Sequence, residues 1–190
     1  MSEPRRLHRF TYADYVGIEM YSDIKHEFLD GEIYAMSGGS AEHAALAAKM
    51  LRLLDAATGD RPCRAYTSDL RIYVEAVGLA TFPDASVICG DVQQHQPSPE
   101  STALNPQILV EVTSESSESY DTGLKLEHYQ TIPTLREYLI VSHRERRITA
   151  YIRTGDTWLT RVAISGGRLE VPSLNAELLV DDIYRNSAIR

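Results

Sequence analysis

The chain has 190 residues, of which 43% are hydrophobic and 24% are charged, close to the averages for globular proteins. These values exclude disordered, collagenous and fibrous classes, and the length leaves no room for a second catalytic domain, so we expect one domain over residues 1–190. The formal net charge of -8 means that a nucleic-acid partner needs a local basic patch or a bound cation.

Cysteine usage and hydropathy bear on the location of the protein, on zinc binding and on membrane insertion. Cys63 and Cys89 form no C-x-x-C pair, and the sequence begins without a charged and then apolar leader. Neither secretion nor a zinc knuckle is indicated, and a cytoplasmic location is expected. No apolar run approaches the roughly 20 residues needed to cross a bilayer, so we expect no membrane partner.

Turn and capping residues organise the first part of the chain. Asp30-Gly31 between two extended segments is a strong signal for a two-residue hairpin turn. Ser40 follows two glycines and precedes an Ala-, Leu- and Met-rich segment, which is typical of a capped helix. The elements predicted here are a short helix from Thr11 toward Ile18, hairpin strands at 25–28 and 32–36, and a helix over 41–56.

A strand, helix, strand unit is predicted in the second part. The apolar run in 107–113 is typical of a strand covered on both faces, and we expect it to pair in parallel with 136–142. The polar segment 93–106 contains three prolines and is expected to be a mobile loop. The other elements predicted are strands at 64–74 and 85–89, a helix capped by Asp121 and running to Tyr129, a hairpin at 147–153 and 157–164, and short edge elements beyond Gly166.

These elements predict an α/β fold with a mixed central β-sheet, helices on its faces and a hairpin-rich periphery. Within that fold, Glu111 interrupts the most apolar strand. A buried carboxylate is costly unless a cation or hydrogen-bond donors compensate it. Strand alternation places Leu109, Glu111 and Thr113 on one face. The alternative is a glutamate at an exposed strand end or paired with a buried arginine.

Asp84 is a second candidate, because it follows Pro83 at the start of the predicted strand 85–89. Alone, Asp84 could equally be a turn residue. Two acids on two apolar strands can nevertheless converge on a hard divalent cation, for which carboxylate oxygen is a preferred ligand.

The helix after the central strand contributes a possible base. A right-handed crossover starts where the strand ends, so Lys125 is expected within reach of Glu111. Tyr129 lies one turn further on the same helix face. A solvated lysine and a core tyrosine are the alternatives.

The front half adds weaker candidates. Glu27 and Glu32 flank the hairpin turn, and His43 lies in the first turn of the helix capped by Ser40. Solvated hairpin acids and a capping histidine explain these residues equally well. Asp69 and Arg71 are expected to share a strand face and to form a surface ion pair at most.

Together, these residues form an ordered set of motifs over about residues 10–142. The motifs are KHEFLDGE at 25–32, MSGGS at 36–40 with His43, SDLR at 68–71, Pro83-Asp84, NP at 105–106, LVEVTS at 109–114, and Tyr120-Asp121 with Lys125 and Tyr129. This pattern closely resembles the Uma-two family, which is classed with restriction endonucleases in the PD-(D/E)XK nuclease superfamily. The segment from Arg147 onward is similar only in being rich in strands.

The resemblance implies a restriction-endonuclease-like fold and a magnesium- or manganese-dependent phosphodiesterase acting on DNA, with a homodimer as the family-level assembly. Asp84 and Glu111 are then the metal ligands, the Val112 carbonyl is a third ligand, and Glu27 completes the acidic cluster. The superfamily's lysine two residues after the glutamate is Thr113 here, so Lys125 has to replace it.

Two other functions remain open from the sequence. The acidic balance and the displaced lysine are also compatible with a catalytically weak or silent nucleic-acid-binding or regulatory module that kept the nuclease fold. The acids could also bind a metal for structure only. Whether basic residues such as Arg64, Arg71 or Arg136 surround the site is left open.

Overall fold

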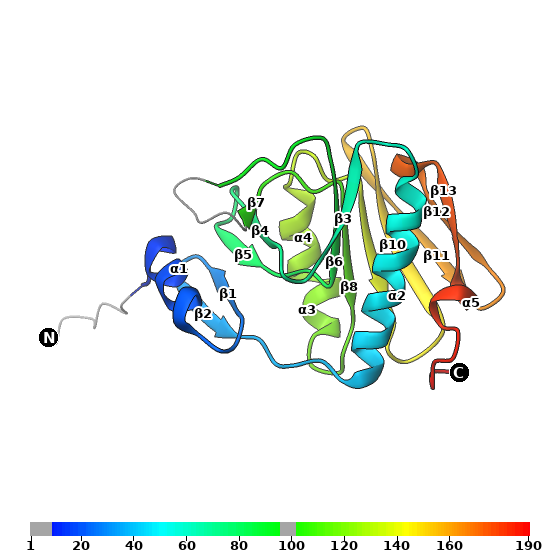
Figure 1. The fold of residues 1–190 in the computed structure, drawn as a ribbon, viewed down its shortest axis with the longest axis horizontal. Helices are drawn as coiled ribbons and strands as arrows, with labels where there is room; N and C mark the ends of the chain where they lie inside the picture. The colour runs from blue at the N-terminus through cyan, green and yellow to red at the C-terminus, as the bar shows by residue number, and fades with distance from the viewer. Residues whose placement is uncertain (1–8, 96–101) are drawn as a thin grey trace, which may run out of the picture.

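The computed structural model describes residues 9–95 and 102–190. The chain combines helices and strands, as expected for an α/β fold (Figure 1). The elements are α1 (Tyr12–Tyr21), β1 (His26–Leu29), β2 (Glu32–Ala35), α2 (Ala41–Thr58), β3 (Cys63–Thr67), β4 (Arg71–Val74), β5 (Leu79–Thr81), β6 (Ala85–Cys89), β7 (Thr102–Ala103), β8 (Ile108–Val112), α3 (Glu118–Thr122), α4 (Leu124–Gln130), β9 (Glu137–Val141), β10 (Arg147–Thr154), β11 (Thr157–Ile164), β12 (Arg168–Val171), η1 (Pro172–Leu174), β13 (Ala176–Leu179) and α5 (Val180–Ile183).

The main sheet of the described chain has six strands in the order β11-β10-β9-β8-β6-β3. β8 and β9 are parallel, joined by the segment that contains α3 and α4, and the other pairs are antiparallel. The predicted mixed central sheet and its parallel strand, helix, strand unit are therefore confirmed.

Each face of this sheet is covered by a different core. All residues of β8 are buried, and they alternate between the two cores as strand geometry requires. Ile108, Val110 and Val112 pack against α2, whereas Leu109 packs against Tyr129 of α4. The central strand thus ends between two layers of helices, as Figure 1 shows for α2 on one side and α4 on the other.

A second sheet in the described chain, with the order β2-β1-β5-β4-β7, was not predicted. Its β1–β2 hairpin turns at the predicted Asp30-Gly31, where φ is 45° and 91° respectively. Positive φ at both central residues matches the right-handed twist of the paired strands, which favours glycine at the second position. Figure 1 shows this sheet beside the main sheet, with α1 packed on its outer side.

The prediction of one strand over 64–74 is wrong. β3 ends at Thr67, and β4 starts at Arg71 in the other sheet. Between them, the Thr67 hydroxyl accepts a hydrogen bond from the Asp69 N–H at 3.3 Å, and the Leu70 N–H bonds to the Thr67 carbonyl. Such local bonds offer the backbone an alternative to the sheet ladder, and here they turn the chain from one sheet into the next.

The single helix capped by Asp121 is also wrong. Asp121 lies inside α3 and is buried, and Gly123 separates α3 from α4. Gly123 has φ -113° and ψ -106°, which is not helical, and a Cβ there would lie 2.8 Å from the Ser119 carbonyl oxygen. The close approach at this glycine explains why the helix is interrupted.

Two peripheral predictions also change. Residues 96–101 of the predicted loop 93–106 lie outside the described part of the chain. Of the rest, β7 pairs in parallel with β4, and the Asn105 side-chain amide bonds to the backbone at positions 91 and 93. The described ends of this segment are therefore ordered. The segment after Gly166 forms a separate ribbon of β12 and β13 rather than edge elements. Its apolar side chains join the core over α2.

Cys63 and Cys89, for which no pairing was predicted, form a disulfide between directly opposite positions of β3 and β6. Among the described residues, no helix is both long and apolar enough to span a membrane.

Candidate active site

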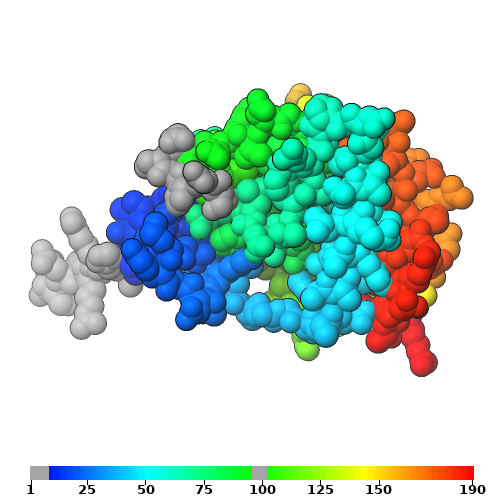
Figure 2. Space-filling model, in the orientation of Figure 1, coloured from blue at the N-terminus to red at the C-terminus, as the bar shows by residue number. Residues whose placement is uncertain are grey.

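A cleft with a volume of about 1050 Å³ is lined by residues of both sheets, of α2 and of the segment after β8. Figure 2 shows the molecule hollowed where the chain leaves the N-terminal hairpin and leads into α2. The predicted residues that line the cleft are Glu27, His43, Asp84, Glu111, Asp121 and Lys125.

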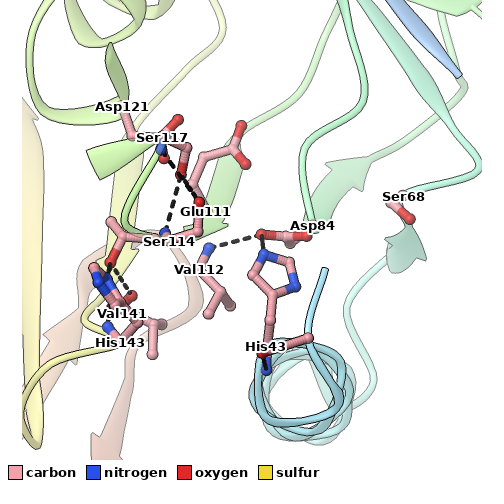
Figure 3. A network of polar contacts seen from close by, with 12 residues as sticks. His43, Ser68, Asp84, Glu111, Val112, Ser114, Ser117, Asp121, Val141 and His143 are labelled. Carbon is pink, nitrogen blue, oxygen red and sulfur yellow. Dashed lines mark hydrogen bonds and ion pairs between the residues drawn. The ribbon is translucent and has the colours of Figure 1, made fainter. Parts of the chain in front are cut away.

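Neighbouring strands of the main sheet present Asp84 and Glu111. β6 and β8 are antiparallel with Ala85 opposite Val110, so the register places position 84 opposite position 111. Directly opposite residues point to the same face of a sheet, with Cβ atoms about 5 Å apart. The backbone N–H of Val112 donates to Oδ2 of Asp84 at 2.7 Å, which fixes the aspartate at the end of the glutamate's strand (Figure 3).

Lys125 is the centre of a buried ion-pair cluster. Its Nζ lies 2.8 Å from Oε1 of Glu111, 3.0 Å from Oε1 of Glu27 and 3.7 Å from Oδ1 of Asp121. The lysine side chain is only 5% exposed, so these charges interact with little solvent screening. The expectation that the helix after β8 brings Lys125 within reach of Glu111 agrees with this geometry.

Hydrogen bonds hold the two glutamates of the cluster. The Tyr129 hydroxyl donates to Oε1 of Glu111 at 2.8 Å, and the Thr81 hydroxyl donates to Oε1 of Glu27. Tyr129 is fully buried, so it is both a core residue and a partner of the glutamate. These donors are the compensation that a carboxylate inside an apolar strand requires.

The cluster holds more carboxyl groups than cationic groups, so the carboxyl groups disfavour one another's ionisation. Burial raises the pKa of Glu111 to about 8, Lys125 lowers it in part, and the charges of Asp84 and Asp121 raise it further. Burial likewise raises the pKa of Asp121. The neighbouring carboxylates outweigh the burial of Lys125 and hold its pKa well above the ordinary value, so the lysine remains an ammonium.

This charge balance fits a divalent cation. Glu27, Glu111 and Asp121 share the Lys125 ammonium, Asp84 acts electrostatically on Glu111 and Asp121, and carboxylate oxygens are the ligands that Mg²⁺ takes in proteins. Among the described residues, no group of three or more His, Cys, Asp or Glu side chains is arranged to hold a metal. Mg²⁺ commonly takes one or two protein carboxylates and completes its shell with water. Asp84 and Glu111 can supply these two carboxylates.

His43 reaches the same aspartate from the start of α2. The Ser40 hydroxyl caps the helix by accepting from the His43 N–H at 3.1 Å, and Nε2 of His43 lies 3.3 Å from Oδ2 of Asp84. The contact with Asp84 raises the pKa of His43 above its ordinary value, although burial opposes this shift. The imidazole is therefore a partner of the acidic pair as well as part of a capped turn.

Two of the predicted supporting residues lie elsewhere. Glu32 is exposed on β2 and accepts from the Tyr34 hydroxyl. Asp69 pairs with Lys25 at 2.8 Å, and the expected pair with Arg71 is wrong, because the turn before β4 separates them. Arg71 is instead buried, 3.9 Å from Glu19.

Three residues in or beside the cleft were not among the site candidates from the sequence, although Tyr120 stands in the motif set. His143 lines the cleft, and its Nδ1 lies 2.8 Å from the hydroxyl of Thr113, the residue that stands where the resemblance leads one to expect a lysine. Tyr120 lies beside Lys125, with Nζ 5.6 Å from the ring centre, and Thr81 binds Glu27. His143 and Thr81 belong to segments whose position depends on sheet packing, so no local signal marks them.

The charged side chains that line the cleft are mostly acidic. Among the described residues that line it, Lys25 and Lys125 are the only lysines or arginines, so Arg64, Arg71 and Arg136 do not surround it. An anionic substrate therefore gains attraction here mainly through a bound cation.

Comparisons with known proteins agree with this fold. The family model described as "Uma2: Putative restriction endonuclease" matches residues 12–180. The uncharacterized proteins slr1290 and sll1609 of Synechocystis sp. are 35% and 32% identical over 95% and 85% of this chain, and the matches cover 94% and 90% of those proteins. A crystal structure from Anabaena variabilis, titled as a "putative nuclease belonging to DUF820", superposes with a TM-score of 0.70 at 18% identity, covering 86% of this chain and 91% of that one. The restriction-endonuclease-like fold is thereby confirmed.

Proposed function

We propose that this chain, which belongs to the Uma2 family, is an endonuclease that hydrolyses DNA phosphodiester bonds with Mg²⁺ or Mn²⁺. The observation that carries the proposal is the convergence of Asp84, Glu111 and Lys125 in one cleft, from two neighbouring strands and the helix that follows them. These are the residue types that metal-assisted phosphodiester hydrolysis requires.

The protein's own groups have separable roles in this proposal. Asp84 and Glu111 hold the cation, and the Val112 carbonyl is a further ligand. The Val112 N–H and the Tyr129 hydroxyl fix the two carboxylates. When bound, the cation supplies an activated water and offsets charge on the phosphoryl oxygens.

Lys125 has the role of the superfamily lysine. Its ammonium lies 2.8 Å from Glu111, so it can donate a hydrogen bond to a phosphate oxygen or orient the attacking water beside the metal ligands. Glu27 and Asp121 keep this lysine charged and in place. Loss of either carboxylate should weaken catalysis less than loss of Lys125 itself.

A second candidate is a silent DNA-binding or regulatory module with the nuclease fold. It is supported by the ion pairs of Lys125, which already neutralise part of the charge of Glu111 and Glu27, and by the acidic lining of the cleft. Such a module would retain DNA binding after Glu111→Ala and would hydrolyse nothing under any divalent metal.

The direct test uses purified protein with Mg²⁺ or Mn²⁺ on supercoiled plasmid and single-stranded DNA, beside the Asp84→Ala variant. We expect the wild type to nick the plasmid and the variant to lose at least about a hundredfold in rate, as is common when a metal-holding group is removed. Equal nicking by both proteins would discard the assignment. The proposal also includes a homodimer and a cytoplasmic location, which gel filtration and cell fractionation can check.

A further inference from the structure

We infer that His43 is a positioning residue that orients Asp84 for metal binding, and that Gly39 exists in this chain to leave room for its imidazole. The inference rests on the proposed function and adds to it a residue pair outside the acidic cluster. Four contacts of the described residues carry it.

The first two contacts converge on one oxygen of the aspartate. Nε2 of His43 lies 3.3 Å from Oδ2 of Asp84, and the N–H of Val112 donates to the same Oδ2 at 2.7 Å. Figure 3 shows both dashed lines meeting at this atom. Among the described residues, Oδ1 of Asp84 has no hydrogen-bond partner. One oxygen is thus held by the protein, and the other remains available to a cation.

The third contact fixes where the histidine starts. The Ser40 hydroxyl accepts from the His43 backbone N–H at 3.1 Å, which places His43 in the first turn of α2. The 18-residue helix packs on the main sheet through Leu46, Met50 and Leu54, so its first turn is anchored against the sheet that carries Asp84.

The fourth contact is a close approach that only glycine allows. A Cβ built on Gly39 would lie 2.6 Å from Nδ1 of His43, closer than real Cβ atoms come, and 3.0 Å from Cγ, which is tighter than nine in ten real contacts. A Cβ on the neighbouring Gly38 would meet nothing within 4 Å. Neither glycine has a positive φ, so alanine meets no left-handed backbone strain at either position. Gly39→Ala therefore displaces the imidazole, and Gly38→Ala is its matched control.

Two measurements test the inference. Hydrolysis of plasmid DNA is followed at varied Mn²⁺ concentration, and Mn²⁺ binding is measured by calorimetry without DNA. We expect His43→Ala and Gly39→Ala each to weaken Mn²⁺ affinity or the rate by roughly 10- to 100-fold, the usual effect of removing a group that orients a metal ligand. Gly38→Ala should match the wild type, and His43→Gln, which keeps a donor near Oδ2, should recover part of the loss.

A double-mutant cycle separates positioning from general damage to α2. If Gly39 only makes room for the imidazole, Gly39→Ala should have no further effect in the His43→Ala background. Additive losses, a Gly38→Ala variant as defective as Gly39→Ala, or a His43→Ala variant with wild-type affinity and rate would each overturn the inference. Melting temperatures of all variants are to be measured, so that a loss caused by unfolding is recognised.

The failure of the inference and of the proposed function are distinguishable. A wild-type protein that nicks DNA while the His43 and Gly39 variants do so equally well refutes only the positioning role. A wild-type protein that binds Mn²⁺ without hydrolysis refutes the nuclease, while the calorimetric series still decides the role of His43. A wild-type protein that does neither refutes both.

Discussion

Glu27 of β1 and Lys125 of α4 form a buried ion pair, with 3.0 Å between Oε1 and Nζ. Glu27 belongs to the second sheet, whereas α4 connects two strands of the main sheet. Glu27 is also bound by the Thr81 hydroxyl at the end of β5, in its own sheet. The second sheet therefore delivers a carboxylate to a lysine that the main sheet places beside Glu111. The cluster is complete only when the two sheets pack together.

Lys125→Met should be strongly destabilising because it leaves buried carboxylates without their counter-charge. We expect a loss of about 3–5 kcal/mol in the free energy of unfolding, measured by urea denaturation. Lys25→Met is the control, because its pair with Asp69 is largely exposed and is worth at most about 1 kcal/mol. An equal loss in the free energy of unfolding of the two variants would contradict the prediction, because it would show that the buried ion pairs contribute no more to stability than the exposed one.

A divalent cation should stabilise the wild-type protein, because it offsets the excess carboxylate charge around Glu111. We expect Mg²⁺ or Mn²⁺ to raise the melting temperature, by an amount equivalent to about 2.7 kcal/mol at a hundredfold excess over Kd. Asp84→Asn should lose most of this increase. NaCl at matched ionic strength is the control, and an equal increase with NaCl would show screening rather than a site.

The pH dependence of stability should include a contribution from Glu137. Burial raises its pKa above the ordinary value of 4.5, although Ser173 donates to both carboxylate oxygens and opposes the shift. The native state then binds a proton more tightly than the unfolded chain does, so stability falls as pH rises from about 4.5 to the native pKa.

Glu137→Gln should remove this fall, since the amide keeps acceptor and donor positions for Ser173 without a charge to bury. Urea denaturation at a series of pH values gives the comparison, with Glu177→Gln on the exposed face of β13 as the control. A variant whose stability falls with pH as steeply as that of the wild type would contradict the assignment.

Reduction of the Cys63–Cys89 disulfide should destabilise the fold without abolishing it. The bond joins residues 26 positions apart in the sequence, and closing a loop of this size is worth about 3 kcal/mol. Urea denaturation with and without reductant measures the loss, and a Cys63→Ser variant should not respond to reductant. Asp84 precedes the first residue of β6, whereas the disulfide lies at the last residue of that strand. Mn²⁺ binding should therefore be unaffected by reduction.

Local chemistry determined much of this protein from the sequence alone. The Asp30-Gly31 turn, the Ser40 cap and the alternation along β8 each depend on neighbouring residues, and all three are confirmed. Glu111 stood out for the same reason, since a carboxylate within an apolar strand requires compensation wherever the strand lies.

Packing decided most of the rest. The second sheet follows from pairing between distant segments, which no local pattern encodes. The break between β3 and β4 and the interruption at Gly123 depend on contacts within a few residues, which the strand and helix patterns did not reveal. The contact between Lys125 and Glu111 was predicted from the handedness of the crossover. The contact between Glu27 and the same lysine was not predicted, because it forms only where the two sheets meet. Burial and long-range charge set the chemistry of these groups, and both exist only in the folded chain.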